Sequence, residues 1–524
     1  MVRSTYPDVE IPGTSIYDFL FGDLDESRLD ATALIDGMTG AVTTYRQLVG
    51  QIDLFAGALA ARGVGVGTKV GVLCPNVPAF ATVFHGILRA GATATTINSL
   101  YTADEIANQL TDAGATWLVT VSPLLPGAQA AAERLGLDAD HVIVLDGAEG
   151  HPSLPQLLGE GHTAPDVSFD PATHLAVLPY SSGTTGRPKG VMLTHRNLVA
   201  NVSQCRSTIS LADDDRVLAV LPFFHIYGMT VLLNFALRQR AALVTMPKFD
   251  LAEFLRVVQE HRTSWVFIAP PIAVALAKHP LVDQYDLSAI KVIFSGAAPL
   301  DGALASAVAH RLGCVVCQGY GMTETSPVTH AIPYDRTDVD RSSVGMLLAN
   351  TEARLLAEDG GDVPIPETGA SEPGELLIRG PQVMQGYLNR PDATAEMLDA
   401  DGWLHTGDVA TATADGVFRI VDRLKELIKY KGYQVAPAVL EAVLLEHPAI
   451  ADAAVIGALD ADGQEVPKAF IVLQQGAELD ADAVMAHVAA HVAPHEKVRQ
   501  VEFIDVIPKS SSGKILRKDL RARA

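Results

Sequence analysis

Residues 181–190 read Ser181-Ser182-Gly183-Thr184-Thr185-Gly186-Arg187-Pro188-Lys189-Gly190 and follow a short apolar run that is typical of a β-strand. The stretch combines four hydroxyl side chains, three glycines and two cations. Glycine lets the backbone approach a ligand closely, and exposed N–H groups and hydroxyls can surround phosphate oxygens. The Walker pattern does not fit, because Pro188 interrupts it. The composition therefore predicts a phosphate-binding loop, with an ordinary surface turn as the open alternative.

Short apolar runs rich in Val, Ile and Leu alternate with helical stretches on both sides of this loop. The predicted strands are residues 70–73, 117–121, 141–145, 175–178, 217–221, 265–269, 291–294 and 315–317, and helices are predicted at 251–261, 272–279 and 303–312. This alternation predicts an α/β fold with largely parallel sheets. Because ligands gather at the carboxyl ends of strands in such sheets, several loops are expected to meet at one crevice.

The length of 524 residues predicts at least two domains, since a single hydrophobic core stops growing well below that size. Residues 360–367 are rich in turn formers and interrupt a more strand-like region. The pattern then changes near residue 426. The predicted elements of the remaining chain are a helix at 436–446, strands at 453–457 and 468–473, a helix at 480–491 and a strand at 501–504. The tail therefore predicts a small α+β domain.

The chain is acidic, with a formal net charge of -22. Broad binding of phosphates needs a basic face, so nucleic acid and anionic membranes are disfavoured as partners. No window approaches the roughly 18 uninterrupted apolar residues of a membrane span. The amino terminus lacks the apolar core of a signal peptide, and the last residues do not read Ser-Lys-Leu. We expect a cytoplasmic protein without a membrane span.

Four cysteines are present, and Cys314 and Cys317 have the spacing of a redox or zinc pair. A four-ligand zinc site needs a second pair, which the sequence lacks. The two valines between them favour a buried strand, in which cysteine behaves as a small apolar residue. Free thiols are typical of a reducing compartment.

Several further segments, together with residues 181–190, are similar in sequence and order to the motifs of the adenylate-forming superfamily. They read Pro222-Phe223-Phe224-His225-Ile226-Tyr227-Gly228, Ser295-Gly296-Ala297-Ala298-Pro299, Gln318-Gly319-Tyr320-Gly321-Met322-Thr323-Glu324, Leu404-His405-Thr406-Gly407-Asp408, Val421-Asp422-Arg423-Leu424-Lys425-Glu426 with its continuation to Pro437, and Pro508-Lys509-Ser510-Ser511-Ser512-Gly513-Lys514. The resemblance spans essentially the whole chain. It is nearest to acyl-CoA synthetases and 4-coumarate–CoA ligases.

The resemblance implies a large amino-terminal region (1–423) of packed α/β subdomains that includes a distorted β-barrel. It further implies a hinge (424–426) at Lys425 and a small mobile α+β domain (427–524). The implied activity is that of an AMP-forming acid–CoA ligase, which joins ATP and a carboxylic acid to an acyl adenylate and then transfers the acyl group to coenzyme A. Mg²⁺ is the implied metal. The expected assembly is a monomer or a weak homo-oligomer.

The resemblance also assigns the nucleotide site. Its predicted residues are Ser181, Ser182, Gly183, Thr184, Thr185, Gly186, Lys189, Gly296, Ala297, Ala298, Gln318, Gly319, Tyr320, Gly321, Met322, Thr323, Asp408 and Arg423. Among these, Asp408 and Arg423 are expected to hold the ribose, and Thr323 the α-phosphate. Glu324 is the expected Mg²⁺ ligand, a role for which one carboxylate suffices when phosphates and waters supply the rest.

Catalysis is expected from Lys514, His225, Thr323, Glu324, Lys429 and Gln434. By resemblance, Lys514 bridges the carboxylate and the α-phosphate during adenylation. His225 contacts the incoming carboxylate, although a buried structural histidine is the ordinary interpretation of an isolated His between aromatics. A solvated basic tail is the corresponding alternative for Lys514.

The implied acyl pocket consists of Ile226, Tyr227, Thr230, Phe267, Phe294, Gly319, Gly321, Pro327, Val328 and Thr329. These residues are largely apolar. Plant coumarate ligases commonly carry Asn and Lys where this chain has Thr230 and Phe294. The departure favours a less polar acid, either cinnamate-type or a medium-chain fatty acid.

Three alternatives stay open at this stage. A carrier-protein loading enzyme uses the same first reaction, but no carrier segment follows residue 524 in this sequence. A luciferase-like oxygenase shares the 425–437 motif. A nucleotide-binding regulator without catalysis is disfavoured because Lys514, Glu324, Thr323 and Asp408 are all present.

Overall fold

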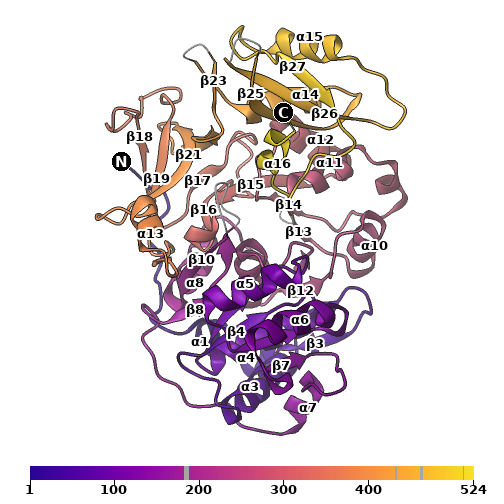
Figure 1. Ribbon diagram of the computed structural model, residues 1–524, viewed down its shortest axis with the longest axis vertical. Helices are drawn as coiled ribbons and strands as arrows, with labels where there is room; N and C mark the ends of the chain where they lie inside the picture. The colour runs from indigo at the N-terminus through magenta and orange to yellow at the C-terminus, as the bar shows by residue number, and fades with distance from the viewer. Residues whose placement is uncertain (182–187, 431–432, 461–463, 511–512, 524) are drawn as a thin grey trace.

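The computed structural model describes residues 1–523 except 182–187, 431–432, 461–463 and 511–512. Figure 1 shows the chain rising from its amino-terminal half at the bottom to a small carboxyl-terminal unit at the top. One long sheet runs through the middle of the molecule, and its strands all precede the carboxyl-terminal unit in sequence.

The first half of this long sheet is parallel and contains four of the predicted strands. In spatial order its strands are β15 (Val315–Gly321), β14 (Val292–Ser295), β13 (Trp265–Ile268), β11 (Arg216–Ala219), β12 (Ala242–Thr245) and β2 (Thr32–Asp36), with β3 (Val42–Thr44) antiparallel at the edge. Buried Val, Ile, Leu and Phe side chains occupy most of these strands, as expected for a sheet covered on both faces.

The second half of the sheet is antiparallel and was not part of the prediction of parallel sheets. It continues from β15 through β16 (Val328–Ala331), β17 (Gly345–Leu347), β22 (Val417–Arg423), β21 (Leu404–Ala412), β19 (Gly374–Arg379), β18 (Glu352–Leu356) and β1 (Val2–Arg3). The resemblance implies a distorted β-barrel in this region. The sheet therefore changes from parallel to antiparallel at β15, which carries the 318–321 motif.

The second sheet also combines a parallel part with antiparallel strands. Its order is β20 (Gly386–Tyr387), β10 (Lys189–Thr194), β8 (Leu175–Val177), β5 (Thr93–Thr96), β4 (Lys69–Val72), β6 (Trp117–Thr120) and β7 (Val142–Val144), with β9 (Tyr180–Ser181) also paired to β10. The strands from β8 to β7 are parallel, as predicted, and β10 is antiparallel to β8 and β20.

Helices cover these sheets, and their ends follow ordinary capping chemistry. They are α1 (Ile16–Phe21), α2 (Glu26–Leu29), α3 (Tyr45–Ala61), α4 (Pro78–Arg89), α5 (Ala103–Ala113), α6 (Leu125–Leu135), α7 (Leu154–Gly159), α8 (His195–Cys205), α9 (Phe235–Arg238), α10 (Leu251–His261), α11 (Pro270–Lys278), α12 (Gly302–Leu312) and α13 (Pro391–Met397). Asp301 caps α12 by accepting from two backbone N–H groups, and Gly313 ends it with a φ of 65°. A π-helix spans Gly228–Asn234.

The small carboxyl-terminal unit has its own core. It contains β23 (Ile428–Tyr430), β24 (Tyr433–Val435), α14 (Pro437–Glu446), β25 (Ile450–Leu459), β26 (Glu465–Leu473), α15 (Ala481–His491), β27 (Gln500–Phe503) and α16 (Arg517–Arg521). The predicted order of helix, strand, strand, helix and strand is confirmed. Its buried cluster of Ile428, Val435, Leu440, Ala469 and others draws only on residues after 427.

Bonds at the junction hold the small unit in place. The carboxylate of Asp422, at the end of the large unit, accepts a 2.9 Å hydrogen bond from the N–H of Ala438 in the first turn of α14. Lys278 at the end of α11 donates to the carbonyl of Leu445 over 3.3 Å. Within the small unit, Arg521 pairs with Glu426.

Cys314 and Cys317 were predicted to belong to a buried strand. Cys317 lies buried in β15, as predicted, and Cys314 is half-buried just before it. Burial raises the pKa of both thiols, to about 11 for Cys314 and about 12 for Cys317.

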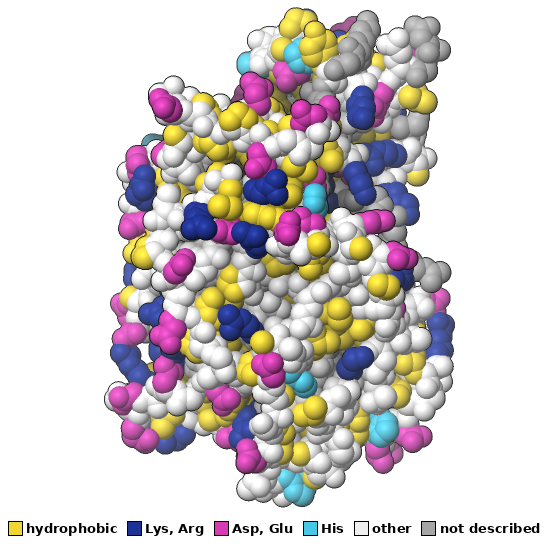
Figure 2. All heavy atoms as spheres, turned by 90° about the vertical axis from the view of Figure 1, so that its left-hand side faces the viewer, with side chains coloured by type: hydrophobic (Ala, Val, Ile, Leu, Met, Phe, Trp, Pro, Cys, Tyr) yellow, Lys and Arg dark blue, Asp and Glu magenta, His cyan; other side chains and the backbone are white. Residues whose placement is uncertain are grey.

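Among the described residues, no helix has the length and apolar character needed to cross a membrane. On the face drawn in Figure 2, basic and acidic side chains are interspersed. The cytoplasmic location stays a prediction.

Three fully buried histidines give the fold a defined pH dependence. Burial lowers the pKa of His85, His195 and His330 to about 3, from about 6.5 in an unfolded chain. Between these values the unfolded chain binds more protons, so stability falls as the pH drops from about 6.5 towards 3. Each such site changes the free energy of unfolding by about 1.4 kcal/mol per pH unit.

Replacing His85 with leucine is therefore expected to lower the slope of the free energy of unfolding against pH. The expected decrease is the contribution of one proton, about 1.4 kcal/mol per pH unit. His85 packs between Phe21 and Phe84, and no described residue bonds either of its ring nitrogens, so an apolar side chain is tolerated there. Urea unfolding at pH 7.5 and pH 5 measures the slope. Exposed His310 gives the control, H310L, and an unchanged slope in H85L would contradict the assignment.

Candidate active site

The described ends of the predicted phosphate loop form the base of a β-hairpin. In this hairpin Ser181 of β9 lies opposite Lys189 of β10, and Tyr180 lies opposite Gly190. A Cβ on Gly190 would stand 3.1 Å from the ring of Tyr180, so a larger residue there would require the ring to shift. The predicted residues Ser182, Gly183, Thr184, Thr185 and Gly186 lie outside the described residues.

Glu324 lies at the end of β15, in the short 3₁₀ turn Thr323–Thr325. Its side chain is buried, with 5% of its surface exposed. Oε1 accepts a 2.7 Å hydrogen bond from the hydroxyl of Tyr387, and the backbone carbonyl accepts from the N–H of Met384 over 2.8 Å. The sequence analysis missed Tyr387, because it belongs to no recognised motif.

Asp408 lies in the middle of the predicted ribose site. It stands on β21 directly opposite Arg423 of β22, and its Oδ1 is 3.5 Å from Nε of that residue. Its other oxygen accepts from the hydroxyl of Tyr320. Burial raises the pKa of Asp408, and the guanidinium of Arg423 opposes this. The structure therefore brings three predicted nucleotide-binding residues together.

Glycine is required where aromatic rings cross the adjoining strands. A Cβ on Gly296 would lie 2.7 Å from the ring of Tyr227, and one on Gly319 would lie 3.0 Å from the ring of Phe294. Ala297, the next residue after Gly296, adopts a φ of 71°. The 296–298 segment and the aromatic residues of the predicted acyl pocket are therefore in direct contact.

Gln318 has a structural role that its motif did not indicate. Its amide accepts from the N–H of Leu300 over 3.1 Å and donates to the carbonyls of Leu300 and Arg341, over 3.0 and 2.6 Å. The side chain is 3% exposed. These bonds hold the 296–300 loop, which carries the predicted nucleotide-binding residues Gly296, Ala297 and Ala298, against β15.

Lys514 reaches this crevice from the small unit. Burial lowers its pKa, Arg423 lowers it further, and the carboxylates of Asp408 and Glu324 raise it. The pKa of His225 is in turn lowered to about 3, by burial and then by Lys514. The ammonium group therefore lies within electrostatic reach of His225, Asp408 and Glu324.

The turn that carries Lys514 rests against the large unit. A Cβ on Gly513 would lie 3.3 Å from the side chain of Ala269 and 3.6 Å from Pro271, and the φ of Gly513 is 84°. The N–H of Ser510 donates to the carbonyl of Lys514 over 2.8 Å, which closes the turn. This docking brings the lysine to the crevice.

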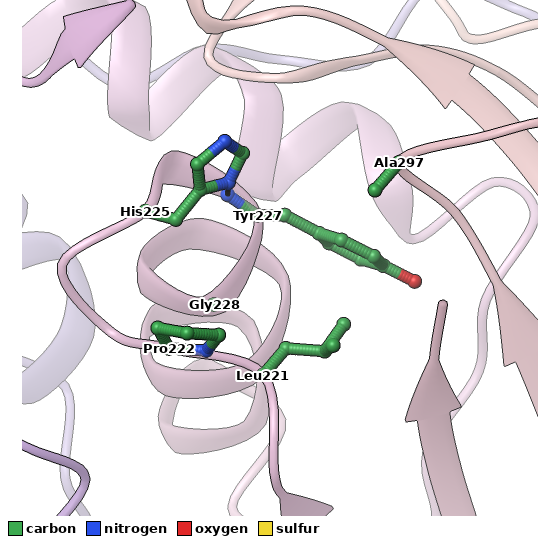
Figure 3. Close-up of a pocket in the computed structure, with 6 residues that line it drawn as sticks. All are labelled: Leu221, Pro222, His225, Tyr227, Gly228 and Ala297. Carbon is green, nitrogen blue, oxygen red and sulfur yellow. Dashed lines mark hydrogen bonds between the residues drawn. The ribbon is translucent and has the colours of Figure 1, made fainter. Parts of the chain in front are cut away.

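A small pocket opens beside His225 (Figure 3). It is lined by Leu221, Pro222, His225, Tyr227, Gly228 and Ala297. The side chain of Tyr227 extends towards Ala297, and its hydroxyl donates to the carbonyl of Phe294 over 3.3 Å. Tyr227 is the predicted acyl-pocket residue that lines this space. Leu221, Pro222 and Gly228 were not assigned to the pocket from the sequence.

The other predicted pocket residues surround the same region. Phe267 and Phe294 stand on neighbouring strands with ring centroids 5.6 Å apart. Thr230 is fully buried in the π-helix, and its hydroxyl has no partner among the described residues. Ile226 lies just before the π-helix. Gly321 ends β15, which pairs with β14, and Pro327, Val328 and Thr329 lie at the start of β16, which pairs with β15.

Lys429 on β23 pairs with Gln434 on β24 in the small unit. Lys429 is exposed, and its N–H donates to Glu465 over 2.9 Å. Lys425 is also exposed, at the junction. No contact between described residues joins Lys429 to Lys514 or Asp408. Their predicted catalytic and hinge roles stay predictions.

Comparisons with known proteins agree with this geometry. The family model "AMP-binding enzyme" matches residues 23–388, and "AMP-binding enzyme C-terminal domain" matches residues 439–514. The chain is 42% identical to 4-coumarate–CoA ligase 5 of Oryza sativa subsp. japonica over 99% of its length and 97% of that protein. It is 41% identical to a 4-coumarate–CoA ligase of Pinus taeda, covering 100% and 97%.

Solved structures are similar over nearly the whole chain. The anthranilate CoA ligase AuaEII in complex with anthranoyl-AMP gives a TM-score of 0.90 at 26% identity, covering 98% of both chains. ATP-bound MatB from Rhodopseudomonas palustris gives 0.87 at 28% identity, covering 97% and 98%. From the family match over both units and the full-length similarity, the protein belongs to the AMP-binding family, as an adenylate-forming acid–CoA ligase of the 4-coumarate–CoA ligase group that binds ATP and an acid.

Proposed function

We propose that the protein activates a cinnamate-type acid of low polarity and transfers it to coenzyme A. The observation that carries this proposal is the aromatic lining of the predicted acyl pocket, where the ring of Tyr227 passes close to Gly296 and Phe267 packs on Phe294. A flat aryl ring fits between such surfaces. The relatives at about 40% identity, which are 4-coumarate–CoA ligases, favour an aryl-propenoic acid over a medium-chain fatty acid.

The first half-reaction forms the acyl adenylate. A carboxylate oxygen of the acid attacks the α-phosphorus of ATP, the new O–P bond forms, and the bond to pyrophosphate breaks. Both reactants are anions, so their approach needs a cation. A pair of unit charges 4 Å apart is worth about 4 kcal/mol at an effective dielectric of 20. We assign this task to Lys514, beside neutral His225, which contacts the carboxylate.

The residues around Glu324 fit a magnesium ion. Its carboxylate is buried at the crevice, Tyr387 holds Oε1, and Oε2 has no hydrogen bond from a described residue. One carboxylate, waters and substrate phosphates are a usual set of Mg²⁺ ligands. Mg²⁺ held there would neutralise charge on the phosphates. Asp408 and Arg423 are proposed to hold the ribose in both half-reactions.

In the second half-reaction the thiolate of coenzyme A attacks the acyl carbon, the C–S bond forms and AMP leaves. We propose that the small unit turns about Lys425 between the two steps, which withdraws Lys514 from the crevice. A domain movement that exposes one site to two reactions in turn is a common gating design.

An acid panel tests the proposed substrate. Cinnamate, 4-hydroxycinnamate, benzoate and fatty acids of several lengths are each supplied with ATP, Mg²⁺ and coenzyme A, and the release of AMP and thioester are followed together. We expect cinnamate to give the highest kcat/KM. Higher values for the fatty acids would overturn the proposal.

The Thr230→Asn variant is expected to shift the preference towards 4-hydroxycinnamate. The added amide offers a hydrogen bond to a ring hydroxyl, and sites that bond such a group discriminate far more strongly than apolar ones. The measurement is the ratio of kcat/KM for the two cinnamates. Thr230→Val is the control and should leave the ratio unchanged, because the hydroxyl of Thr230 has no described partner. Equal ratios in all three proteins would contradict this role of Thr230.

A further inference from the structure

Tyr387 lies on the short strand β20, and hydrogen bonds hold both its backbone and its side chain. Only 4% of its surface is exposed. Its N–H donates to the hydroxyl of Thr394 over 2.9 Å, and its own hydroxyl donates to Oε1 of Glu324 over 2.7 Å. The side chain therefore has one orientation, and a carboxylate at the crevice is its hydrogen-bond partner.

The same segment also holds the backbone of Glu324. The N–H of Met384, three residues before Tyr387, donates to the carbonyl of Glu324 over 2.8 Å. Residues 384–387 thus bind Glu324 at its backbone and at one oxygen of its carboxylate. Two separate anchors fix both the position of the residue and the rotation of its carboxylate.

The segment is joined in turn to the strand that leaves the predicted phosphate loop. Tyr387 pairs with Val191 of β10, and the N–H of Leu388 donates to the carbonyl of Gly190 over 2.8 Å. The ammonium of Lys189, at the start of β10, lies 4.6 Å from the centre of the Tyr387 ring. An aromatic face at this distance attracts a cation. Lys189, Tyr387 and Glu324 therefore form one connected row.

We propose that Tyr387 is a positioning residue for the metal-binding carboxylate. By holding Oε1, it leaves Oε2 of Glu324 to bind Mg²⁺ when the ion is present, and its ring holds the ammonium of Lys189, which would attract the phosphates of bound ATP. This inference rests on the proposed role of Glu324 and adds a residue that no motif identified. It also gives a reason for the pairing of β20 with β10, which joins the phosphate loop to the metal ligand.

The Tyr387→Phe variant removes one oxygen and keeps the ring. We expect it to raise the Mg²⁺ concentration needed for half-maximal ATP–pyrophosphate exchange by about tenfold, because hydrogen bonds to charged groups are among the stronger ones. Thioester formation from a supplied acyl adenylate does not use the metal-bound pyrophosphate and should keep its rate. Calorimetry gives a second readout: binding of ATP should weaken in Mg²⁺ and stay unchanged in EDTA.

The matched control is Tyr17→Phe. Tyr17 is also a buried tyrosine whose hydroxyl donates to a carboxylate, that of Asp53, over 3.0 Å in the amino-terminal half. Its loss should leave the Mg²⁺ dependence unchanged. An equal loss of both half-reactions in Tyr387→Phe would show a merely structural role and overturn the inference.

Glu324→Gln separates the inference from the function on which it rests. If this variant keeps the wild-type Mg²⁺ dependence, the metal role of Glu324 is wrong. If it changes that dependence and Tyr387→Phe does not, the metal role stands and the positioning role of Tyr387 is wrong. If Tyr387 acts through Glu324, the double variant should be no worse than Glu324→Gln alone, whereas additive losses would contradict the coupling.

Discussion

Replacing Lys514 with alanine is expected to slow acyl-adenylate formation by about a thousandfold, since losing a preorganised charged donor costs a factor of that order. The ammonium interacts electrostatically with Asp408, Glu324 and His225, and no other described lysine interacts with all three. Thioester formation from a supplied acyl adenylate should continue, because the proposed turn of the small unit removes Lys514 before that step. Both half-reactions are measured separately, by ATP–pyrophosphate exchange and by thioester release.

Lys518 provides the control for this experiment. It is exposed, four residues further along the chain, and Lys518→Ala changes the charge of the small unit equally. Its two rates should match those of the unaltered protein. If Lys514→Ala lost both half-reactions to the same extent, the lysine would be needed for the fold or for nucleotide binding in general.

Asp408→Asn is expected to weaken both half-reactions together. Ribose is present in ATP and in the acyl adenylate, so a lost ribose contact affects both steps. The asparagine keeps one oxygen for the hydroxyl of Tyr320 but removes the charge that faces Arg423. The loss of a charge-assisted hydrogen bond in this buried site is expected to raise the KM for ATP about tenfold to hundredfold.

The control for Asp408 is Asp340→Asn. Asp340 also pairs with an arginine of β22, Arg419, but it is exposed, and such pairs contribute little. Its KM values should stay unchanged. A loss in Asp408→Asn that is confined to adenylation would place Asp408 beside Lys514 in function and remove its assignment to the ribose.

Much of the parallel fold could be predicted because its strands are short, apolar and bounded by turn residues. Helix α10 was predicted with its observed bounds, since Asp250 caps its first turn and its apolar residues repeat at helical spacing. The antiparallel half was not predicted strand by strand. Its register depends on pairs far apart in sequence, such as Glu352 with Arg379, which no local pattern reveals.

Some residues of the candidate site were also predictable from the sequence and others were not. Residues within motifs, such as Asp408 and Lys514, were found by resemblance, and the structure brings them together. Tyr387 was missed because its partner Glu324 lies 63 residues away in sequence and no local pattern links the two. The bonds of Gln318 to the 296–300 loop could not be predicted, because an amide bonds a nucleotide and a backbone loop equally well.

The bonds at the junction have a consequence for the exchange of small units between relatives. Among ion pairs between described residues, none joins residues 1–423 to residues 424–524. The pairs of Arg517 with Glu441 and of Arg521 with Glu426 lie wholly on one side. Across the boundary, Asp422 and Lys278 bond only to the main chain of Ala438 and Leu445, which every non-proline residue supplies. A graft that begins at residue 424 thus carries its own ion pairs, and what its host must match is the apolar packing of Val409 and Val421 against Leu427 and Ala436.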